Sequence, residues 1–228
     1  MNKLPQNKDT YNDLYNKQKH IEAYERKYFH SAYYPLFKAV LKAVKRSGGT
    51  SILEVGCGFG HFALMLKQNT DLIYQGFDFS SVAVERAQKI TGYEKEITVA
   101  DATIEKTYKS YNYDTIVCTE VLEHIPNDLE TISLWNSGTY CICSVPNYDS
   151  SDHVRYFNTK EEVLNRYGHE IDIDCIVQKT KPFLDDLKFS NIVRALIWNR
   201  YRPRRLLAIL GFKSFDDGGW FVFSGRKK

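Results

Sequence analysis

The chain has 228 residues, of which 43% are hydrophobic and 26% charged, a balance typical of one ordinary globular domain. Its 13 glycines and 6 prolines exclude a collagen-like or low-complexity protein, and its 5 cysteines, with no C-x-x-C spacing, argue against a disulfide framework or a structural zinc site. The net charge is +3, but residues 187–214 hold seven basic residues and no acidic one, which leaves 24 basic against 28 acidic residues elsewhere, a net charge of −4.

Residues 1–50 predict a helical, tyrosine-rich segment. Leu36, Val40 and Val44 recur near the helical period, and we expect this helix to end near Arg46, before two glycines. Four tyrosines of this segment are candidates to cover a site: Tyr24, Tyr28, Tyr33 and Tyr34. Packing of the helix on a sheet is the alternative role for them.

Strands and helices are expected to alternate in the rest of the chain. Short apolar runs predict seven strands, at 51–55, 71–77, 96–100, 113–119, 139–145, 172–178 and 220–224. Helical spacing and capping residues predict helices at 59–67, 81–90, from 127, at 160–167 and at 188–198. This alternation is typical of βαβ units, so we expect an α/β fold with a parallel sheet.

A glycine-rich turn follows the first strand, where residues 54–60 are Glu-Val-Gly-Cys-Gly-Phe-Gly. Glycines at such a turn let a ligand approach the backbone closely, although a simple tight turn is the alternative. About 20 residues on, Asp78 ends the second strand, where a carboxylate can accept hydrogen bonds from ribose hydroxyls. Asp101 ends the third strand in the same way, so both acids are expected at one sheet edge.

These segments resemble the class I S-adenosylmethionine-dependent methyltransferases. The resemblance rests on I-L-E-V-G-C-G-F-G-H at 52–61, G-F-D at 76–78 and D-T-I-V-C-T-E-V-L-E-H-I at 114–125. It is strongest to the branch of the ubiquinone-biosynthesis O-methyltransferases and many small-molecule methyltransferases. It implies a Rossmann-like, seven-stranded, mostly parallel sheet whose last strand is antiparallel. A nicotinamide-dependent dehydrogenase is the structural rival, but its G-x-G-x-x-G pattern is broken by His61.

The resemblance implies that S-adenosyl-L-methionine is the cofactor. Three glycines would line its methionine and ribose part, namely Gly56, Gly58 and Gly60. Asp78 would bind the ribose hydroxyls, and Phe79 would pack on the adenine. Asp101 and Ala102 would meet the adenine edge, and Thr119 would lie near the methionine.

A second polar cluster follows the fourth and fifth strands, with E-V-L-E-H at 120–124 and a histidine about 30 residues later. E-x-x-E-H resembles two groups that place a divalent ion there, the eukaryotic ubiquinone O-methyltransferases and the small-RNA 3′-end 2′-O-methyltransferases. Carboxylates and imidazoles suit Mg²⁺ or Mn²⁺, and the ligands would be Glu120, Glu123, His124 and His153. Methyltransferases without a metal share this pattern, and His124 or His153 would then be the general base.

Two further segments are candidates for substrate binding. Residues 153–157, H-V-R-Y-F, resemble the H-x-R-x-F/Y segment that faces the substrate pocket in the small-molecule branch. Arg155 suits a carboxylate or phosphate, with Tyr156 beside it; the alternative is a surface arginine paired with Asp149 or Asp152. Tyr28 and Tyr33 are expected to line the substrate side of an N-terminal lid.

The basic tract lies between the sixth and seventh strands, where methyltransferases often build a substrate cap. Its arginines surround Trp198 and Tyr201. This mixture suits nucleic acid, an anionic membrane surface touched peripherally, or an anionic small substrate, which we favour. A solvated face beside a packed helix is the fourth possibility.

We therefore predict a methyltransferase that acts on an oxygen of a small or sugar-like, anionic acceptor. The alternatives are a metal-dependent RNA 2′-O-methyltransferase and a non-catalytic cofactor-binding regulator. The single domain, 1–228, would comprise an N-terminal helical lid (1–47), a cofactor-binding core (48–178), a substrate-cap insertion (179–218) and a final strand (219–228). The longest aliphatic run, 206–210, is far below the roughly 18 residues that span a bilayer, and residues 1–9 lack a signal-peptide pattern. We expect a cytoplasmic protein.

Overall fold

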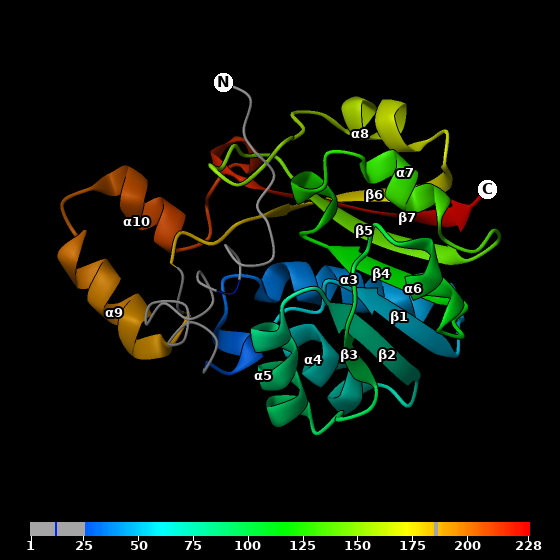
Figure 1. Cartoon of the computed structure of the whole chain (residues 1–228). Coiled ribbons are helices and arrows are strands. Elements are labelled where there is room, and N and C mark those ends of the chain that lie inside the picture. Colours follow the sequence, from blue (N-terminus) through cyan, green and yellow to red (C-terminus); the bar gives the residue numbers. More distant parts are fainter. Residues whose placement is uncertain (1–11, 13–25, 185–186) are drawn as a thin grey trace.

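The computed structural model describes residues 12, 26–184 and 187–228 (Figure 1). Tyr24 and much of the predicted lid at 1–47 lie outside these residues. Within them a seven-stranded sheet has the order β3-β2-β1-β4-β5-β7-β6. Its strands are β1 (Ser51–Val55), β2 (Ile73–Asp78), β3 (Ile97–Val99), β4 (Thr115–Thr119), β5 (Tyr140–Pro146), β6 (Ile171–Thr180) and β7 (Gly219–Lys227).

The direction of the strands confirms the predicted sheet. β1 to β5 pair in parallel, whereas β7 runs antiparallel to both β5 and β6. β6 therefore runs in the same direction as β5. The carboxyl ends of β1, β2, β4, β5 and β6 all lie at one edge of the sheet, the edge at which α/β folds bind ligands.

Helices cover both faces of this sheet (Figure 1). The helices on the sheet are α3 (Tyr34–Ser47), α4 (His61–Asn69), α5 (Ser81–Thr91), α6 (Glu105–Lys109), α7 (Asp128–Ser133) and α8 (Lys160–Tyr167), and two more, α9 (Phe189–Trp198) and α10 (Pro203–Ile209), follow β6. Short 3-10 turns are η1 (Tyr28–His30), η2 (Leu122–His124) and η3 (Phe215–Asp217). None of the helices that the structure describes is long and apolar enough to cross a membrane.

Two apolar cores follow from the alternation of side chains along the strands. Ile52 faces α3, α4 and α5, whose buried residues include Leu36, Phe62 and Val84. Leu53, the next residue, faces α6, α7 and α8. α3 thus packs on the sheet through the apolar stripe that its sequence predicts.

The predicted helix ends agree with the structure to within a few residues. α3 stops at Ser47, and Gly48 follows in the left-handed conformation at φ 70°, where glycine is favoured. The Ser80 side chain accepts a hydrogen bond from Ala83 N at the start of α5, and Thr159 does the same for Glu162 N at α8. α6 and α10 were not predicted, because five and seven residues are too few to show a helical period.

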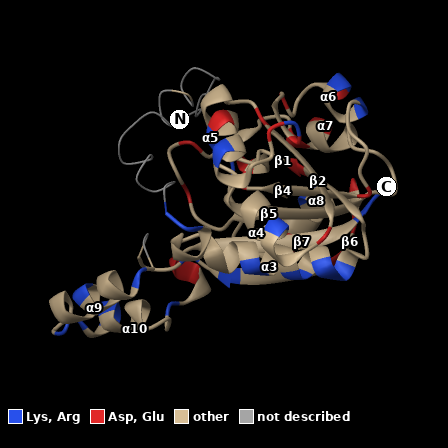
Figure 2. Cartoon of the chain, turned by 90° about the horizontal axis from the view of Figure 1, so that it is seen from below, with Lys and Arg blue, Asp and Glu red and all other residues tan. Residues whose placement is uncertain are grey.

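The helices α9 and α10 form a hairpin that projects from the body of the molecule (Figure 2). Neither helix buries a residue in the described structure. The hairpin connects the end of β6 to the start of β7, so it begins and ends at the edge that gathers the carboxyl ends of the strands.

Candidate active site

The glycine turn after β1 is built for close approach to its backbone. Gly56, Gly58 and Gly60 have φ values of 69°, 51° and 75°, which favour glycine. A Cβ on Gly56 would meet Val121 at 2.3 Å and one on Gly60 would meet Ala87 at 3.0 Å, so these two allow tight packing. Among the described residues, none would lie within 4 Å of a Cβ on Gly58. Gly58 is only partly buried, which fits a turn that a ligand can approach.

Asp78 links this turn to the next helix. Its Oδ2 accepts a hydrogen bond from Gly58 N at 3.0 Å, and its Oδ1 accepts one from Ser80 N at 2.9 Å. The residue is 4% exposed, and burial raises the pKa of its carboxyl to about 6 although the backbone hydrogen bonds oppose this shift. Asp78 thus fixes the turn and lies at the position predicted for the ribose contact.

Glu54 was not predicted to have a role of its own. It is buried in β1 and accepts a hydrogen bond from the Tyr74 hydroxyl at 2.6 Å. Burial raises the pKa of its carboxyl to about 8, and the neighbouring Asp78 adds to the rise. An acid within the apolar run of a strand was the sequence signal for this buried group.

The other residues predicted to contact the cofactor follow β2, β3 and β4. Phe79 is half-buried directly after Asp78. Asp101 is exposed, and its Oδ1 accepts hydrogen bonds from the backbone N and the hydroxyl of Thr103 at 2.8 and 2.7 Å. Ala102 lies beside it, and Thr119 ends β4 half-buried. The fold brings them to the same edge as the turn, and their contacts with a cofactor stay predictions.

The loop after β4 holds a strained acid. Glu120 has φ 57° and is the one non-glycine residue with a positive φ in the described part of the chain, and such strain is frequent at functional sites. Its backbone N donates to Ser144 Oγ at 3.1 Å, and that hydroxyl donates to Glu120 Oε1 at 3.2 Å. Burial raises the pKa of Glu120 to about 7.

Glu123, His124 and His153 come together from two loops. Each offers a ligand atom, and these atoms lie within 4.8 Å of one another. Glu123 is fully buried, and neither of its carboxylate oxygens has a hydrogen-bond partner among the described residues. Burial and the nearby Glu120 raise its pKa well above the usual value. A buried acid with so few hydrogen bonds is costly, which makes this cluster a candidate site for a ligand.

Backbone carbonyls orient both histidine rings. His124 Nδ1 lies 2.9 Å from the Asp152 carbonyl oxygen, and His153 Nδ1 lies 3.2 Å from that of Tyr148. The ring centroids are 5.1 Å apart. A neutral ring that donates from Nδ1 carries its lone pair on Nε2, the nitrogen through which an imidazole accepts a proton or ligates a metal. Burial lowers the pKa of His124, which favours this neutral form.

Arg155 is not directed into the histidine cluster. Its guanidinium donates to the carbonyl oxygens of Leu122, Ile125 and Pro126, the latter two at 2.6 and 2.7 Å. It also pairs with the buried Asp128 at 3.2 Å. These contacts hold the loop that carries Glu123 and His124, so Arg155 has a positioning role whether or not it also meets substrate.

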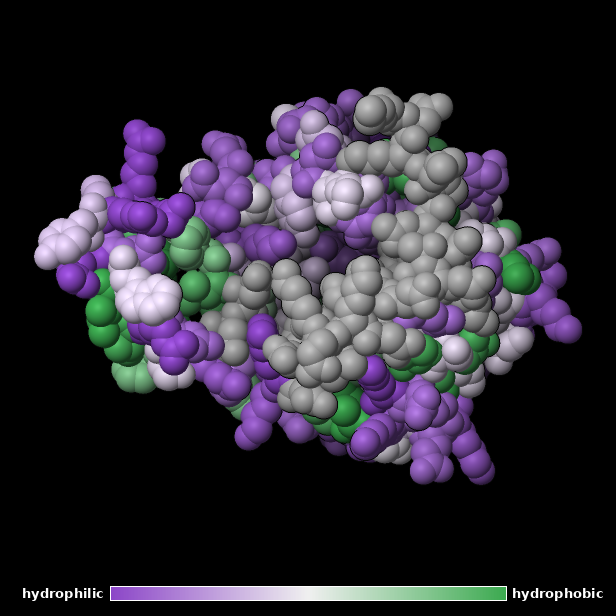
Figure 3. Space-filling model, turned by 60° about the vertical axis from the view of Figure 1, so that its left-hand side comes forward, coloured by the Kyte–Doolittle hydropathy of each residue, from purple (hydrophilic) through white to green (hydrophobic). Residues whose placement is uncertain are grey.

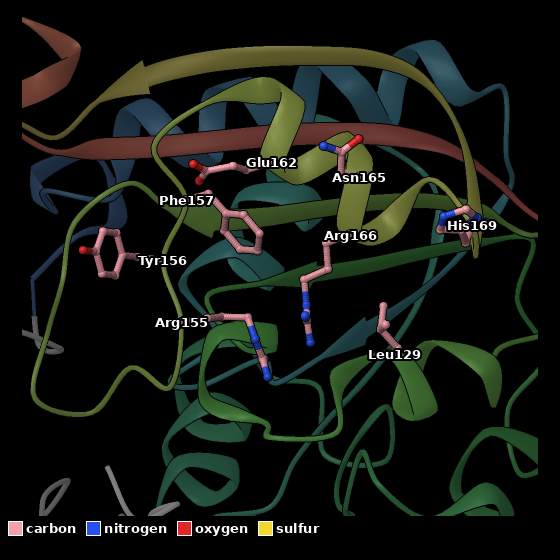
Figure 4. A pocket seen from close by; sticks show the side chains of 8 residues that line it. All are labelled: Leu129, Arg155, Tyr156, Phe157, Glu162, Asn165, Arg166 and His169. Carbon is pink, nitrogen blue, oxygen red and sulfur yellow. The ribbon is translucent and has the colours of Figure 1, made fainter. Parts of the chain in front are cut away.

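Arg155 and Tyr156 line an open depression of about 580 Å³ beside α8 (Figure 4). The other lining residues are Leu129, Phe157, Glu162, Asn165, Arg166 and His169. Tyr156 is 44% exposed. Because the lining includes neither the glycine turn nor the two histidines, this depression is separate from the candidate active site.

The two predicted N-terminal tyrosines lie apart. Tyr28 donates its hydroxyl to Gln68 on α4 at 2.9 Å. The Tyr33 ring lies 5.6 Å from the Trp220 ring, and Trp220 pairs with Pro146 at the carboxyl end of β5. Only Tyr33 is thus brought beside the edge that carries the site.

Residues 26–180 match a family model described as a methyltransferase domain. Among curated proteins, the chain is 35% identical over 82 residues to a ubiquinone biosynthesis O-methyltransferase of Rickettsia canadensis, covering 33% of this chain and 32% of the relative. It is 34% identical over 86 residues to the protein of the same name from Aliivibrio fischeri, covering 37% of each. The matched segment spans about a third of the length of these relatives.

Solved methyltransferase structures share the fold. The magnesium protoporphyrin IX methyltransferase of Synechocystis, with bound S-adenosylmethionine, superposes with a TM-score of 0.58 at 16% identity over 100% of both chains. The N-methyltransferase NodS of Bradyrhizobium japonicum, in complex with S-adenosylhomocysteine, gives 0.53 at 16% identity, covering 97% of this chain and 93% of that one. At such identities the likeness establishes the fold alone.

Proposed function

The chain belongs to the methyltransferase domain family and has the class I S-adenosylmethionine-dependent fold. We propose that it transfers a methyl group from S-adenosyl-L-methionine to an oxygen of a small or sugar-like, anionic acceptor. The observation that carries this proposal is the pair of oriented imidazoles, His124 and His153, beside the buried Glu123. They follow β4 and β5, at the sheet edge that also holds the glycine turn.

For the cofactor, the proposal assigns separate tasks to the turn and the acid. The open backbone at Gly58 would admit the cofactor, and Asp78, held by Gly58 N and Ser80 N, would accept hydrogen bonds from the ribose hydroxyls. The sulfonium of S-adenosylmethionine is already a strong electrophile. Holding the acceptor oxygen, the methyl carbon and the sulfur in line therefore supplies much of the rate enhancement.

For the acceptor, the proposal needs a group that removes the hydroxyl proton. Nε2 of His124 or His153 would take it, because each ring is held through Nδ1 by a carbonyl oxygen and a neutral imidazole is an effective base near neutral pH. Arg155 would keep the loop of His124 in place through its carbonyl contacts. Residues 48–178 would be the cofactor-binding core and residues 179–218 the cap.

A second candidate function is metal-dependent 2′-O-methylation of RNA. It is favoured by the fit of Glu123, His124 and His153 to a divalent cation, since the unpartnered buried carboxylate would gain the charge partner that it lacks. Mg²⁺ or Mn²⁺ bound there, with Glu120 nearby, would lower the pKa of an acceptor hydroxyl. The basic residues at 187–214 agree with an RNA acceptor.

A transfer assay with methyl-labelled S-adenosylmethionine tests both functions. The acceptors would be phenolic and sugar carboxylates and phosphates, and an RNA oligonucleotide, each with and without a chelator. We expect His124→Ala and His153→Ala to slow transfer by about 10²–10⁴-fold, the usual share of a general base, with S-adenosylhomocysteine binding retained. His169→Ala, an exposed histidine away from the cluster, is the matched control. Full activity of the variant that carries both substitutions would contradict the histidine-base mechanism. The second function would be favoured if RNA were the one acceptor that is methylated and if the chelator abolished that activity.

A further inference from the structure

The α9–α10 hairpin, residues 187–214, is unusual among the surfaces of this protein. It carries seven basic residues and no acidic one, and blue patches stand out along its tan helices in Figure 2. Its large apolar side chains are also exposed, with Phe189 at 81%, Trp198 at 77% and Tyr201 at 85%. Four more exposed apolar residues belong to it: Ile197, Leu207, Leu210 and Phe212. Green and white residues accordingly stand beside purple ones on the hairpin in Figure 3.

Exposed arginines next to exposed large apolar side chains are unusual for a hairpin that is surrounded by solvent alone. Solvent-facing helices normally place polar residues outward and apolar residues inward, and contiguous exposed apolar patches mark interaction surfaces. Arginines that alternate with tryptophan, tyrosine and leucine are typical of helices that lie in a membrane interface, where cations meet lipid phosphates and apolar side chains enter the acyl boundary.

The base of the hairpin adjoins the candidate active site. Lys181 N donates to the Gly218 carbonyl oxygen at 2.9 Å, which joins the two ends of the cap. The Lys181 ammonium lies 4.6 Å from the centre of the Tyr148 ring, and the carbonyl of Tyr148 is the group that holds His153. The stem of the hairpin therefore lies at the same edge of the sheet as the histidines.

We propose that the α9–α10 hairpin docks this enzyme on an anionic lipid surface, and that the methyl acceptor is reached at that surface. The second clause rests on the proposed function; the docking itself does not. Charge complementarity selects the occupant, because the hairpin has no acid with which a second copy of its own basic face could pair. Aliphatic Ile197, Leu207 and Leu210 favour lipid over nucleic acid, since bases stack on aromatic rings whereas leucines gain by entering acyl chains.

Sedimentation with vesicles tests the docking on the full chain. We expect co-sedimentation with vesicles of equal parts phosphatidylcholine and phosphatidylglycerol, and little with phosphatidylcholine alone. Arg200→Glu with Arg204→Glu should weaken the partition by roughly tenfold or more, because each basic residue near an anionic surface adds to its attraction. The matched control is Lys42→Glu with Lys45→Glu on α3, exposed lysines with the same change of charge.

Tryptophan fluorescence supplies an independent readout. Trp135 and Trp220 are 3% and 0% exposed, whereas Trp198 is 77% exposed, so a blue shift on adding anionic vesicles reports Trp198 leaving water. We expect that shift in the parent chain and its absence in Trp198→Ala, with S-adenosylhomocysteine titration unchanged in every variant. Equal loss in the α3 control, no shift at Trp198, or binding of an RNA oligonucleotide but not of vesicles would overturn the proposal. Failure to bind S-adenosylhomocysteine would instead overturn the proposed function and leave the docking result standing.

Discussion

Replacing Arg155 with alanine should destabilise the protein and disturb the histidine site without touching the cofactor turn. The wild-type guanidinium donates to three carbonyl oxygens and pairs with Asp128, whose side chain is 0% exposed. Its own side chain is 15% exposed, so water reaches it only in part. Asp128 would keep Arg166 and the Tyr167 hydroxyl as partners.

The expected loss follows from these contacts. A hydrogen bond to a charged group contributes about 1.5–3 kcal/mol, and removing one partner of a buried ion pair costs about 3–5 kcal/mol. Because water and the remaining partners of Asp128 recover part of this, we expect a loss of about 3–5 kcal/mol in the free energy of unfolding. Arg155→Lys should recover little, since an ammonium cannot reproduce the planar fork of donors.

Urea denaturation measures this loss, and calorimetric titration with S-adenosylhomocysteine shows whether the cofactor turn survives. Arg226→Ala is the matched control, because that exposed guanidinium donates to one carbonyl oxygen, that of Gly138, and should matter by about 1 kcal/mol or less. A loss below about 1 kcal/mol in Arg155→Ala would refute the positioning role. If the variant instead raised only the KM of an acceptor, Arg155 would be a substrate-binding residue, as its sequence context first indicated.

Three more predictions concern the buried acids. Asp78→Ala should weaken S-adenosylhomocysteine binding by roughly 10–100-fold, as loss of hydrogen bonds to a charged group implies. Asp101→Ala, at an exposed site, should weaken this binding less. Calorimetry checks both variants, and an affinity of Asp78→Ala equal to that of the parent chain would contradict the site. The folded-state pKa of Glu54 is raised from 4.5 to about 8, so the folded protein favours the protonated side chain. The stability that this protonation provides is complete below about pH 4.5 and is lost as pH rises towards 8. The free energy of unfolding of Glu54→Gln, relative to the parent chain, should therefore be higher at pH 8 than at pH 5 by up to about 3–4 kcal/mol. Urea unfolding that showed no such difference between the two pH values would contradict the burial argument. The second candidate function predicts that titration with Mn²⁺ gives heat in the parent chain and that Glu123→Gln abolishes it, because the amide removes the anionic ligand. No heat in the parent chain would contradict that function, and heat that survives in Glu123→Gln would place the metal elsewhere.

Much of the fold was predictable because its signals are local. The alternation of short apolar runs with helical spacing predicted all seven strands, and the glycine turn and Asp78 lie, as expected, at the edge that gathers the carboxyl ends of the parallel strands. The antiparallel last strand came from the family resemblance and is confirmed. Thr159 caps its helix as expected, and of the two serines expected to cap α5, Ser80 does so, since capping depends on residues only three apart. The side-chain cap expected at Asn127 is absent from the described structure, because this side chain accepts no hydrogen bond from the backbone of the first turn of α7.

The parts that sequence missed depend on contacts between distant residues. Arg155 meets carbonyl oxygens about 30 residues away, so its sequence context could not show that it holds the loop after β4. The burial of Glu123 without a partner likewise depends on how two loops pack. Composition made the basic tract conspicuous, and its place between the sixth and seventh strands was predicted, but the antiparallel pairing of β6 with β7 shows that both ends of its stem lie at the edge that holds the histidines.

The position of β7 also separates the strands of the sheet from the segment between β6 and β7. Because β7 enters the sheet between β5 and β6, the chain leaves and re-enters at one edge, and the bond from Lys181 N to the Gly218 carbonyl oxygen closes the stem of everything between them. A segment held on that stem can change in length or composition without altering the register of the strands. The part of the chain that we propose to choose the acceptor and its surface is thus mechanically independent of the strands that carry the glycine turn and the histidines.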